Sequence, residues 1–141
     1  MKKFIFTIIA INFLFSVQAV QAESNEFIEP TEDTISVSFA DSSSTFKPGL
    51  IDEIVLERAV DASLIIINGR TSTNRPSKKD ERLALSRAIS ARDYLIRQGV
   101  SPLKIMLNYV SSGDFITDNN TKKGRYINQR VDIKIIYVPT Y

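Results

Sequence analysis

Residues 80–105 read DERLALSRAISARDYLIRQGVSPLKI, and small or aliphatic side chains recur there every three or four positions. This spacing predicts an amphipathic helix over about residues 77–98. Gly99 follows at a position where helices commonly end in a left-handed residue. Ser101 and Pro102 are typical of a capped turn, and the apolar residues after them predict a strand. The stretch therefore predicts a helix, a turn and a strand in succession.

One arginine of this helix lies beside its apolar stripe. On a helical wheel, Ala84, Ala88, Ala91 and Leu95 form the centre of the stripe and Arg87 lies on its shoulder. We expect the methylenes of Arg87 to pack on apolar surface while its guanidinium emerges at an edge. A guanidinium held there suits a carboxylate ligand, because its planar fork donates two parallel hydrogen bonds. The alternative is an internal ion pair with an Asp or Glu of the chain.

Further strands and a second helix are predicted around this unit. Alternation of apolar and polar residues predicts half-buried strands over residues 34–39 and 131–138. Residues 64–67 are all apolar, which favours a strand covered on both faces. The apolar positions that predict a first helix after Pro48 are Leu50, Ile51, Ile54, Val55 and Ala59. The order β-α-β-α-β-β predicts an α+β fold, a mixed four-stranded sheet with helices packed on one face.

The N-terminal residues are typical of an export signal. Lys2 and Lys3 precede an almost wholly apolar run over residues 4–17, and small residues follow it. We expect a signal peptide over residues 1–22, cleaved after residue 19 or 22; an uncleaved anchor is the alternative. Residues 23–33 are acidic and aperiodic, so we expect a flexible lead-in. Residues 34–141 are expected to form the folded domain, without a membrane segment once the signal is removed.

The composition argues against several chemistries. The chain has no Cys and no His, so it lacks disulfides, a lipid-attachment cysteine, the usual transition-metal ligands and the commonest general base. We therefore expect no metal, no cofactor and no enzymatic activity. The precursor carries a formal charge of +2, and removal of Lys2 and Lys3 leaves 16 basic against 16 acidic residues. A neutral mature chain gives no reason to expect a nucleic-acid partner.

Three short motifs occur in a fixed order. Residues 80–95 align with the pattern Asn-x-x-Leu-Ser-x-x-Arg-Ala-x-x-Val-x-x-x-Leu, with Asp80, Ala84 and Ala91 at the places of the Asn, the Ser and the Val. The other two motifs are FADSSSTFKPG at residues 39–49 and DNNTKKGRYINQRVDI at residues 118–133. Together they resemble the motifs of the OmpA-like, peptidoglycan-associated domain family. The resemblance covers residues 39–133 and implies a periplasmic domain of a Gram-negative envelope, associated with the outer membrane.

The resemblance also implies a ligand. The family clamps the stem peptide of peptidoglycan, usually through diaminopimelate, by holding its carboxylate with an arginine and its ammonium with an aspartate. Arg87 matches the arginine, but the position of the aspartate is occupied by Ser72. A serine cannot neutralise an ammonium, and charge-assisted hydrogen bonds contribute about 1.5 to 3 kcal/mol against about 1 for neutral ones. We expect binding to be weaker by about tenfold or more.

Six residues are candidate ligand contacts: Arg87, Ser72, Thr71, Asp41, Asp80 and Asn128. Asp41 would replace the missing acid if it reaches the cleft, whereas Arg70 is expected to add a positive charge beside it. For Asn128 we favour a structural role, in which it holds a loop to the sheet. The alternative function is a structural subunit of an envelope-spanning secretion or conjugation complex that has lost peptidoglycan binding.

Overall fold

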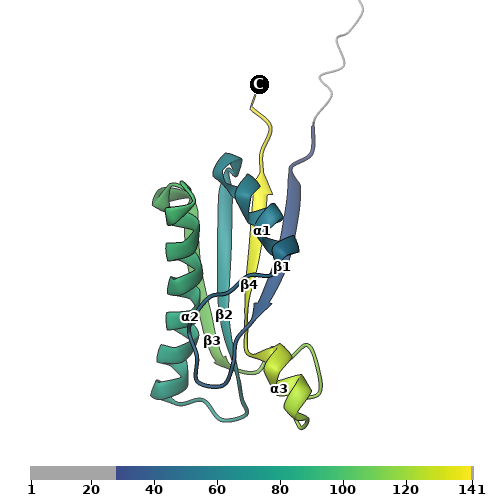
Figure 1. Ribbon diagram of the computed structural model, residues 1–141, viewed down its shortest axis with the longest axis vertical. Coiled ribbons are helices and arrows are strands. Elements are labelled where there is room, and N and C mark those ends of the chain that lie inside the picture. The colour runs from purple at the N-terminus through teal and green to yellow at the C-terminus, as the bar shows by residue number, and fades with distance from the viewer. Residues whose placement is uncertain (1–27, 141) are drawn as a thin grey trace, which may run out of the picture.

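The computed structural model describes residues 28–140, so the predicted signal peptide and residues 23–27 lie outside the described residues. The elements, in chain order, are β1 (Thr31–Ser38), α1 (Leu50–Glu57), β2 (Leu64–Thr73), α2 (Lys78–Arg97), β3 (Ile105–Ser112), α3 (Lys122–Asn128) and β4 (Arg130–Tyr137). Short 3-10 turns follow α1 and precede β3. The predicted α+β fold with a mixed four-stranded sheet is confirmed (Figure 1).

The sheet has the strand order β1-β4-β2-β3. The strand β4 runs antiparallel to both of its neighbours, whereas β2 and β3 are parallel. Helices α1 and α2 cover one face of this sheet, and α3 lies at the end where β4 begins (Figure 1). Because β2 and β3 are parallel, the chain must return along the sheet between them, and α2 is that connection.

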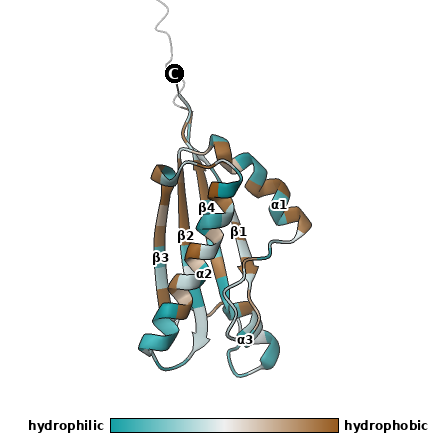
Figure 2. Cartoon of the chain, turned by 60° about the vertical axis from the view of Figure 1, so that its left-hand side comes forward, coloured by the Kyte–Doolittle hydropathy of each residue, from teal (hydrophilic) through white to brown (hydrophobic). Residues whose placement is uncertain are grey.

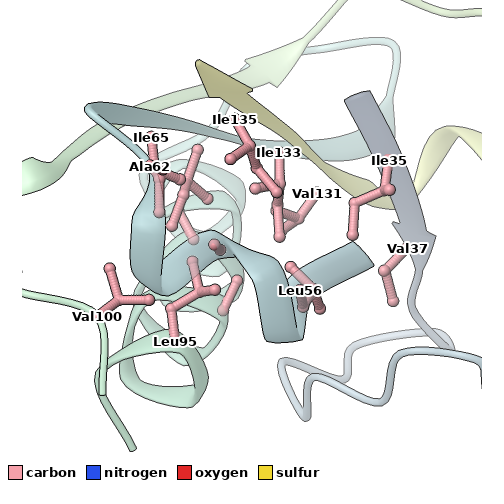
Figure 3. Close-up of a cluster of buried hydrophobic side chains, with 14 of the residues drawn as sticks. Ile35, Val37, Leu56, Ala62, Ile65, Leu95, Val100, Val131, Ile133 and Ile135 are labelled. Carbon is pink, nitrogen blue, oxygen red and sulfur yellow. The ribbon is translucent and has the colours of Figure 1, made fainter. Parts of the chain in front are cut away.

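The hydrophobic core lies between the helices and the covered face of the sheet (Figure 3). Alternate residues of the two central strands point into it: Ile65 and Ile67 from β2, and Val131, Ile133 and Ile135 from β4. From the helix side, the predicted stripe of α2 is buried throughout: Ala84, Ala88, Ala91 and Leu95. The alanine side chains are short, so the helix axis lies close to the sheet.

The helix α2 approaches the sheet closely at Gly69. A Cβ atom placed on this residue would lie 2.1 Å from the carbonyl oxygen of Ala84 and 3.2 Å from the Cβ of Ala88. Only glycine leaves room for a helix backbone at this distance. The contact fixes the start of α2, which carries Asp80 and Arg87, against the end of β2.

Two predictions about the strands were wrong in detail. The strand β1 begins at Thr31, before the predicted start at residue 34, because its first residues pair with the end of β4, where Thr31 lies opposite Tyr137. The end of the expected lead-in is therefore part of the sheet. Nor is β2 covered on both faces: Leu64 and Ile66 are only half-buried, because α1 and α2 lie on the same face of the sheet.

The apolar stripe predicted for the first helix was wrong at three of its five positions, while Val55 packs against the core and Ala59, in the 3-10 turn after α1, is buried. Leu50, Ile51 and Ile54 of α1 have exposed fractions of 75%, 79% and 57%. The helix ends at Glu57, and only the residues near that end, including Leu56, reach the core. Figure 2 shows brown, hydrophobic segments along α1, and three of these residues are exposed.

Candidate functional site

A pocket of about 220 Å³ lies at the end of the sheet where β1 and β2 finish and α2 begins. Its lining residues are Asp41, Ser42, Thr71, Ser72, Thr73, Asp80, Leu83, Arg87 and Gln129. The residues come from the loop after β1, the end of β2, the first turns of α2 and the residue before β4. Of the six candidate contacts, the structure therefore brings all but Asn128 to one pocket.

Arg87 is fully buried, so the prediction that its guanidinium emerges at an edge was wrong. Its Nε donates to the carbonyl oxygen of Ser43 at 2.8 Å, and its Nη1 donates to that of Arg70 at 2.8 Å. Its Nη2 donates to the carbonyl oxygen of Ala40 at 3.4 Å and to Gln129 Oε1 at 3.0 Å. The loop after β1 supplies the carbonyl oxygens of Ala40 and Ser43, whereas the other two acceptors come from β2 and from the residue before β4.

No carboxylate neutralises this buried cation directly. Among the ion pairs formed by residues 28–140, none includes Arg87. Burial lowers the pKa of Arg87 to about 10, and the negative charges of Asp41 and Asp80 act in the opposite direction. The guanidinium is therefore charged at neutral pH, and it lies 5.1 Å from the ring centre of Phe39. The alternative prediction, an internal ion pair of Arg87 with an Asp or Glu, was therefore wrong for residues 28–140.

Gln129, which was not among the predicted contacts, connects the cation to an acid. Its side chain accepts from Arg87 through Oε1 and donates from Nε2 to Asp41 Oδ1 at 2.7 Å. The residue is buried, and its backbone carbonyl accepts a hydrogen bond from the backbone of Phe39 at 2.6 Å. Its place between Asn128 and Arg130, directly before the last strand, was the available signal.

The two acids of the pocket have different environments. Asp41 is exposed, and it accepts the hydrogen bond from Gln129. Asp80 is half-buried in the first turn of α2, where the backbone amide of Asp80 donates to Ser77 Oγ at 3.1 Å. Ser77 Oγ in turn donates to Asp80 Oδ2 at 2.5 Å. Both acids lie near enough to Arg87 to raise its pKa.

The end of β2 forms the hydroxyl-rich wall of the pocket. Thr71 is buried and donates its hydroxyl to the backbone carbonyl of Ser111 on β3. Ser72 is half-buried, and its backbone carbonyl accepts from Asn119 Nδ2 at 2.7 Å. These bonds hold the strand end in place, so the hydroxyl of Ser72 is presented by a fixed backbone.

Asn128 lies away from the pocket and holds the loop before α3. Its Oδ1 accepts the backbone amides of Ile116 and Thr117 at 2.9 and 3.2 Å, and its Nδ2 donates to Thr117 and Asn119. It is fully buried. These contacts agree with the structural role favoured for Asn128, in which it holds a loop in place. Asn128 does not line the pocket.

Arg70 does not add a free positive charge to the pocket. Its Nε donates to Asp114 Oδ2 at 2.6 Å, and Arg130 lies 3.8 Å from the same carboxylate. The hydrogen bond from Arg70 holds the pKa of Asp114 below its ordinary value. Arg70 also is not one of the lining residues, because its side chain points toward this ion pair. The expected repulsion of an ammonium by Arg70 was therefore wrong.

Residues 28–140 contain neither a candidate metal site nor a candidate membrane span. Within residues 28–140, no group of three or more acidic, Cys or His side chains is placed to hold a metal ion. In the same part of the chain, no helix combines the length and the apolar composition needed to cross a membrane.

Two solved structures have the same fold. The peptidoglycan-associated lipoprotein of Burkholderia pseudomallei superposes with a TM-score of 0.61 at 19% identity, covering 72% of this chain and 88% of that one. The cell wall anchor of the T6SS of Pseudomonas aeruginosa gives a TM-score of 0.58 at 20% identity, with coverages of 76% and 82%. At these identities, the likeness shows the fold alone.

Sequence comparison adds a curated relative and a family. A Brucella suis biovar 1 protein, named as an outer membrane lipoprotein of a type IV secretion system, is 31% identical over 109 residues. The match covers 76% of this chain but 63% of the relative, so the chain spans less than two thirds of that protein's length. Residues 38–129 match the family model of the OmpA family. This match covers more than half of the sequence, and the chain belongs to the OmpA family.

Proposed function

We propose that this chain is a periplasmic, non-catalytic module that attaches to the stem peptide of peptidoglycan, with the carboxylate of diaminopimelate held by Arg87. The observation that carries the proposal is a buried guanidinium, without an ion-pair partner among residues 28–140, that lines an open pocket. A buried charge is costly unless it is paired. A ligand carboxylate entering the pocket would supply the missing negative charge.

The pocket has the size and polarity for such a ligand. About 220 Å³ suits the end of one amino acid side chain, and Thr71, Ser72 and Thr73 line one wall. The hydroxyls of Thr71 and Thr73 donate to backbone carbonyls, which leaves the hydroxyl of Ser72 for a ligand. Membership of the OmpA family and the structural likeness to a peptidoglycan-associated lipoprotein support the same ligand. The predicted export signal would deliver the domain to the compartment that contains peptidoglycan.

Closing the pocket should abolish binding without unfolding the domain. The mature chain should sediment with isolated sacculi, and Ser72→Trp should remain in the supernatant, because an indole on the end of β2 would fill the space above Arg87. Thr34→Trp is the matched control, since Thr34 is an exposed strand residue that does not line the pocket. Failure of the unaltered chain to sediment would reject the proposal.

Restoring an acid at position 72 should tighten binding. Ser72→Asp would place a carboxylate on the wall of the pocket, where it can accept a charge-assisted hydrogen bond from a ligand ammonium. We expect an affinity for sacculi about tenfold higher, from the difference between charged and neutral hydrogen bonds. The affinity is measured by titrating sacculi against a fixed protein concentration. No gain would indicate that Ser72 does not face the ammonium of the ligand.

A second candidate function is favoured by the surface of α1. Leu50, Ile51 and Ile54 form an exposed apolar face on that helix, and apolar clusters of this kind commonly contact other proteins. The matched Brucella suis relative is named for a type IV secretion system. The second candidate is therefore a structural subunit of an envelope-spanning secretion or conjugation complex.

Replacing that apolar face should separate the two candidates. In the subunit function, Leu50→Ser combined with Ile54→Ser should lose partner proteins that co-purify from detergent-solubilised envelope, while Ser72→Trp should keep them. Leu103→Ser is the matched control, because Leu103 is 95% exposed on a different turn of the chain. Purification of the unaltered chain without companions would count against the subunit function.

A further inference from the structure

The acid on α2 is built into the pocket more firmly than the acid of the loop. Ser77 caps the helix and donates its hydroxyl to Asp80 Oδ2, so the carboxylate is fixed relative to the first turn. Among the hydrogen bonds within residues 28–140, Asp80 Oδ1 accepts none, and no cation of these residues forms an ion pair with Asp80. One carboxylate oxygen therefore remains available to a ligand.

The charges that line the pocket are unbalanced. One cation, Arg87, is present with two carboxylates, Asp41 and Asp80, which gives a formal sum of −1 from these three residues. A ligand that carries only a carboxylate would be attracted by Arg87 but repelled by both Asp41 and Asp80. A ligand that carries a carboxylate and an ammonium on neighbouring atoms matches both signs of charge at once.

The two acids are not equivalent partners for that ammonium. Each acid has one oxygen that already accepts a hydrogen bond, Asp41 from Gln129 and Asp80 from Ser77, but Asp41 is exposed. Asp80 is half-buried, so water and salt screen its charge less. Charge interactions in such partly buried positions are stronger than those on an open surface. Asp80 is the better placed acceptor.

We propose that Asp80 accepts the ammonium of the ligand in this chain, so that the acidic side of the pocket lies on α2 and not at Ser72 on β2. The inference rests on the proposed function and specifies its ligand class. The pocket then selects an amino-acid end that carries both a carboxylate and a free ammonium. Peptide ends whose amine is acylated should bind poorly, although their carboxylate is unchanged.

The test combines a change in the protein with a change in the ligand. The mature chain and its Asp80→Asn variant are titrated with untreated sacculi and with sacculi whose free amines have been acetylated. We expect acetylation of the sacculi to lower the affinity of the unaltered chain about tenfold or more. The change Asp80→Asn should lower the affinity for untreated sacculi by a similar factor. On acetylated sacculi the two proteins should differ by less than about twofold, because the charge that Asp80 recognises has been removed.

Two further variants exclude a general loss of structure. Glu81→Gln removes a charge from the same helical turn, but Glu81 pairs with Lys78 and does not line the pocket, so binding should be unchanged. Asp80→Asn combined with Ser72→Asp returns an acid to the pocket from β2, and it should recover binding to untreated sacculi. Recovery would not be expected if Asp80→Asn had unfolded the helix start.

The possible results separate the two proposals. If the unaltered chain does not bind untreated sacculi, the proposed function fails and this inference fails with it. If the unaltered chain binds but Asp80→Asn binds equally well, only the assignment of Asp80 is overturned. The assignment is also overturned if Asp80→Asn loses binding to untreated and acetylated sacculi by the same factor, because the loss would then be independent of the ammonium.

Discussion

Replacing Arg87 with alanine should lower the free energy of unfolding by about 3 kcal/mol or more. The change removes the donor to three backbone carbonyl oxygens, those of Ala40, Ser43 and Arg70, and to the side chain of Gln129. It also leaves a cavity where a fully buried side chain packed. Urea unfolding of the mature chain at neutral pH, followed by circular dichroism, measures the effect.

Arg92→Ala is the control on the same helix. Arg92 is about one third exposed and contacts the adjacent Asp93 at 3.4 Å, so its loss should cost less than about 1 kcal/mol. Equal stabilities of the two variants would mean that the loop after β1 does not depend on the guanidinium. Because Arg87 holds the loop after β1 as well as lining the pocket, loss of ligand binding in Arg87→Ala would not by itself identify a ligand contact.

The change Gly69→Ala should destabilise the domain to a similar extent. The added methyl would lie 2.1 Å from the carbonyl oxygen of Ala84, which belongs to a helix backbone and cannot rotate away. The helix must then move from β2, at a cost of about 3 kcal/mol for overpacking of a rigid contact. We expect the midpoint of thermal unfolding to fall by more than about 10 °C. The same displacement would carry Arg87 and Asp80 away from Ser72, so sacculus binding should also fall.

Gly49→Ala tests whether the position or the residue type matters. A Cβ on Gly49 would meet only Asp52 Oδ2, at the ordinary contact distance of 3.5 Å. The expected loss is below about 1 kcal/mol, which is typical of a change at the residue that precedes a helix. A Gly69→Ala variant as stable as Gly49→Ala would show that α2 can move from the sheet without strain.

The long helix and the central strands were predictable because their periodicity is strong. The stripe of Ala84, Ala88, Ala91 and Leu95 alone determines which side of α2 meets the sheet. The same kind of periodicity gave a wrong prediction of burial in the first helix, since Leu50 and Ile54 have helical spacing but face outward. A periodic pattern predicts a helix with an apolar side, but it does not say whether the chain itself covers that side.

The environment of Arg87 was beyond the sequence for a different reason. Its hydrogen-bond acceptors lie 17 to 47 positions away in the chain, and most of them are backbone carbonyls, which every residue carries. The motifs predicted that Ser72, Asp41 and Asp80 lie near Arg87, because the resemblance supplied their register. The structure places all four residues in one pocket. Gln129 lies in the third motif, but its role as a link between Arg87 and Asp41 depends on their distance in the folded chain.

The antiparallel pairing of β1 with β4 also bears on the load that the proposed attachment would put on the domain. Thr31, at the start of β1, lies opposite Tyr137, whereas Ser38 and the pocket lie at the other end of the strand (Figure 1). A force applied between the N-terminal side of the domain and a wall-bound ligand would act along β1 and pass to β4 through their interstrand hydrogen bonds. The interstrand hydrogen bonds between β1 and β4 would then be loaded in shear, all at the same time. Separating two strands in shear takes a larger force than opening their hydrogen bonds one after another.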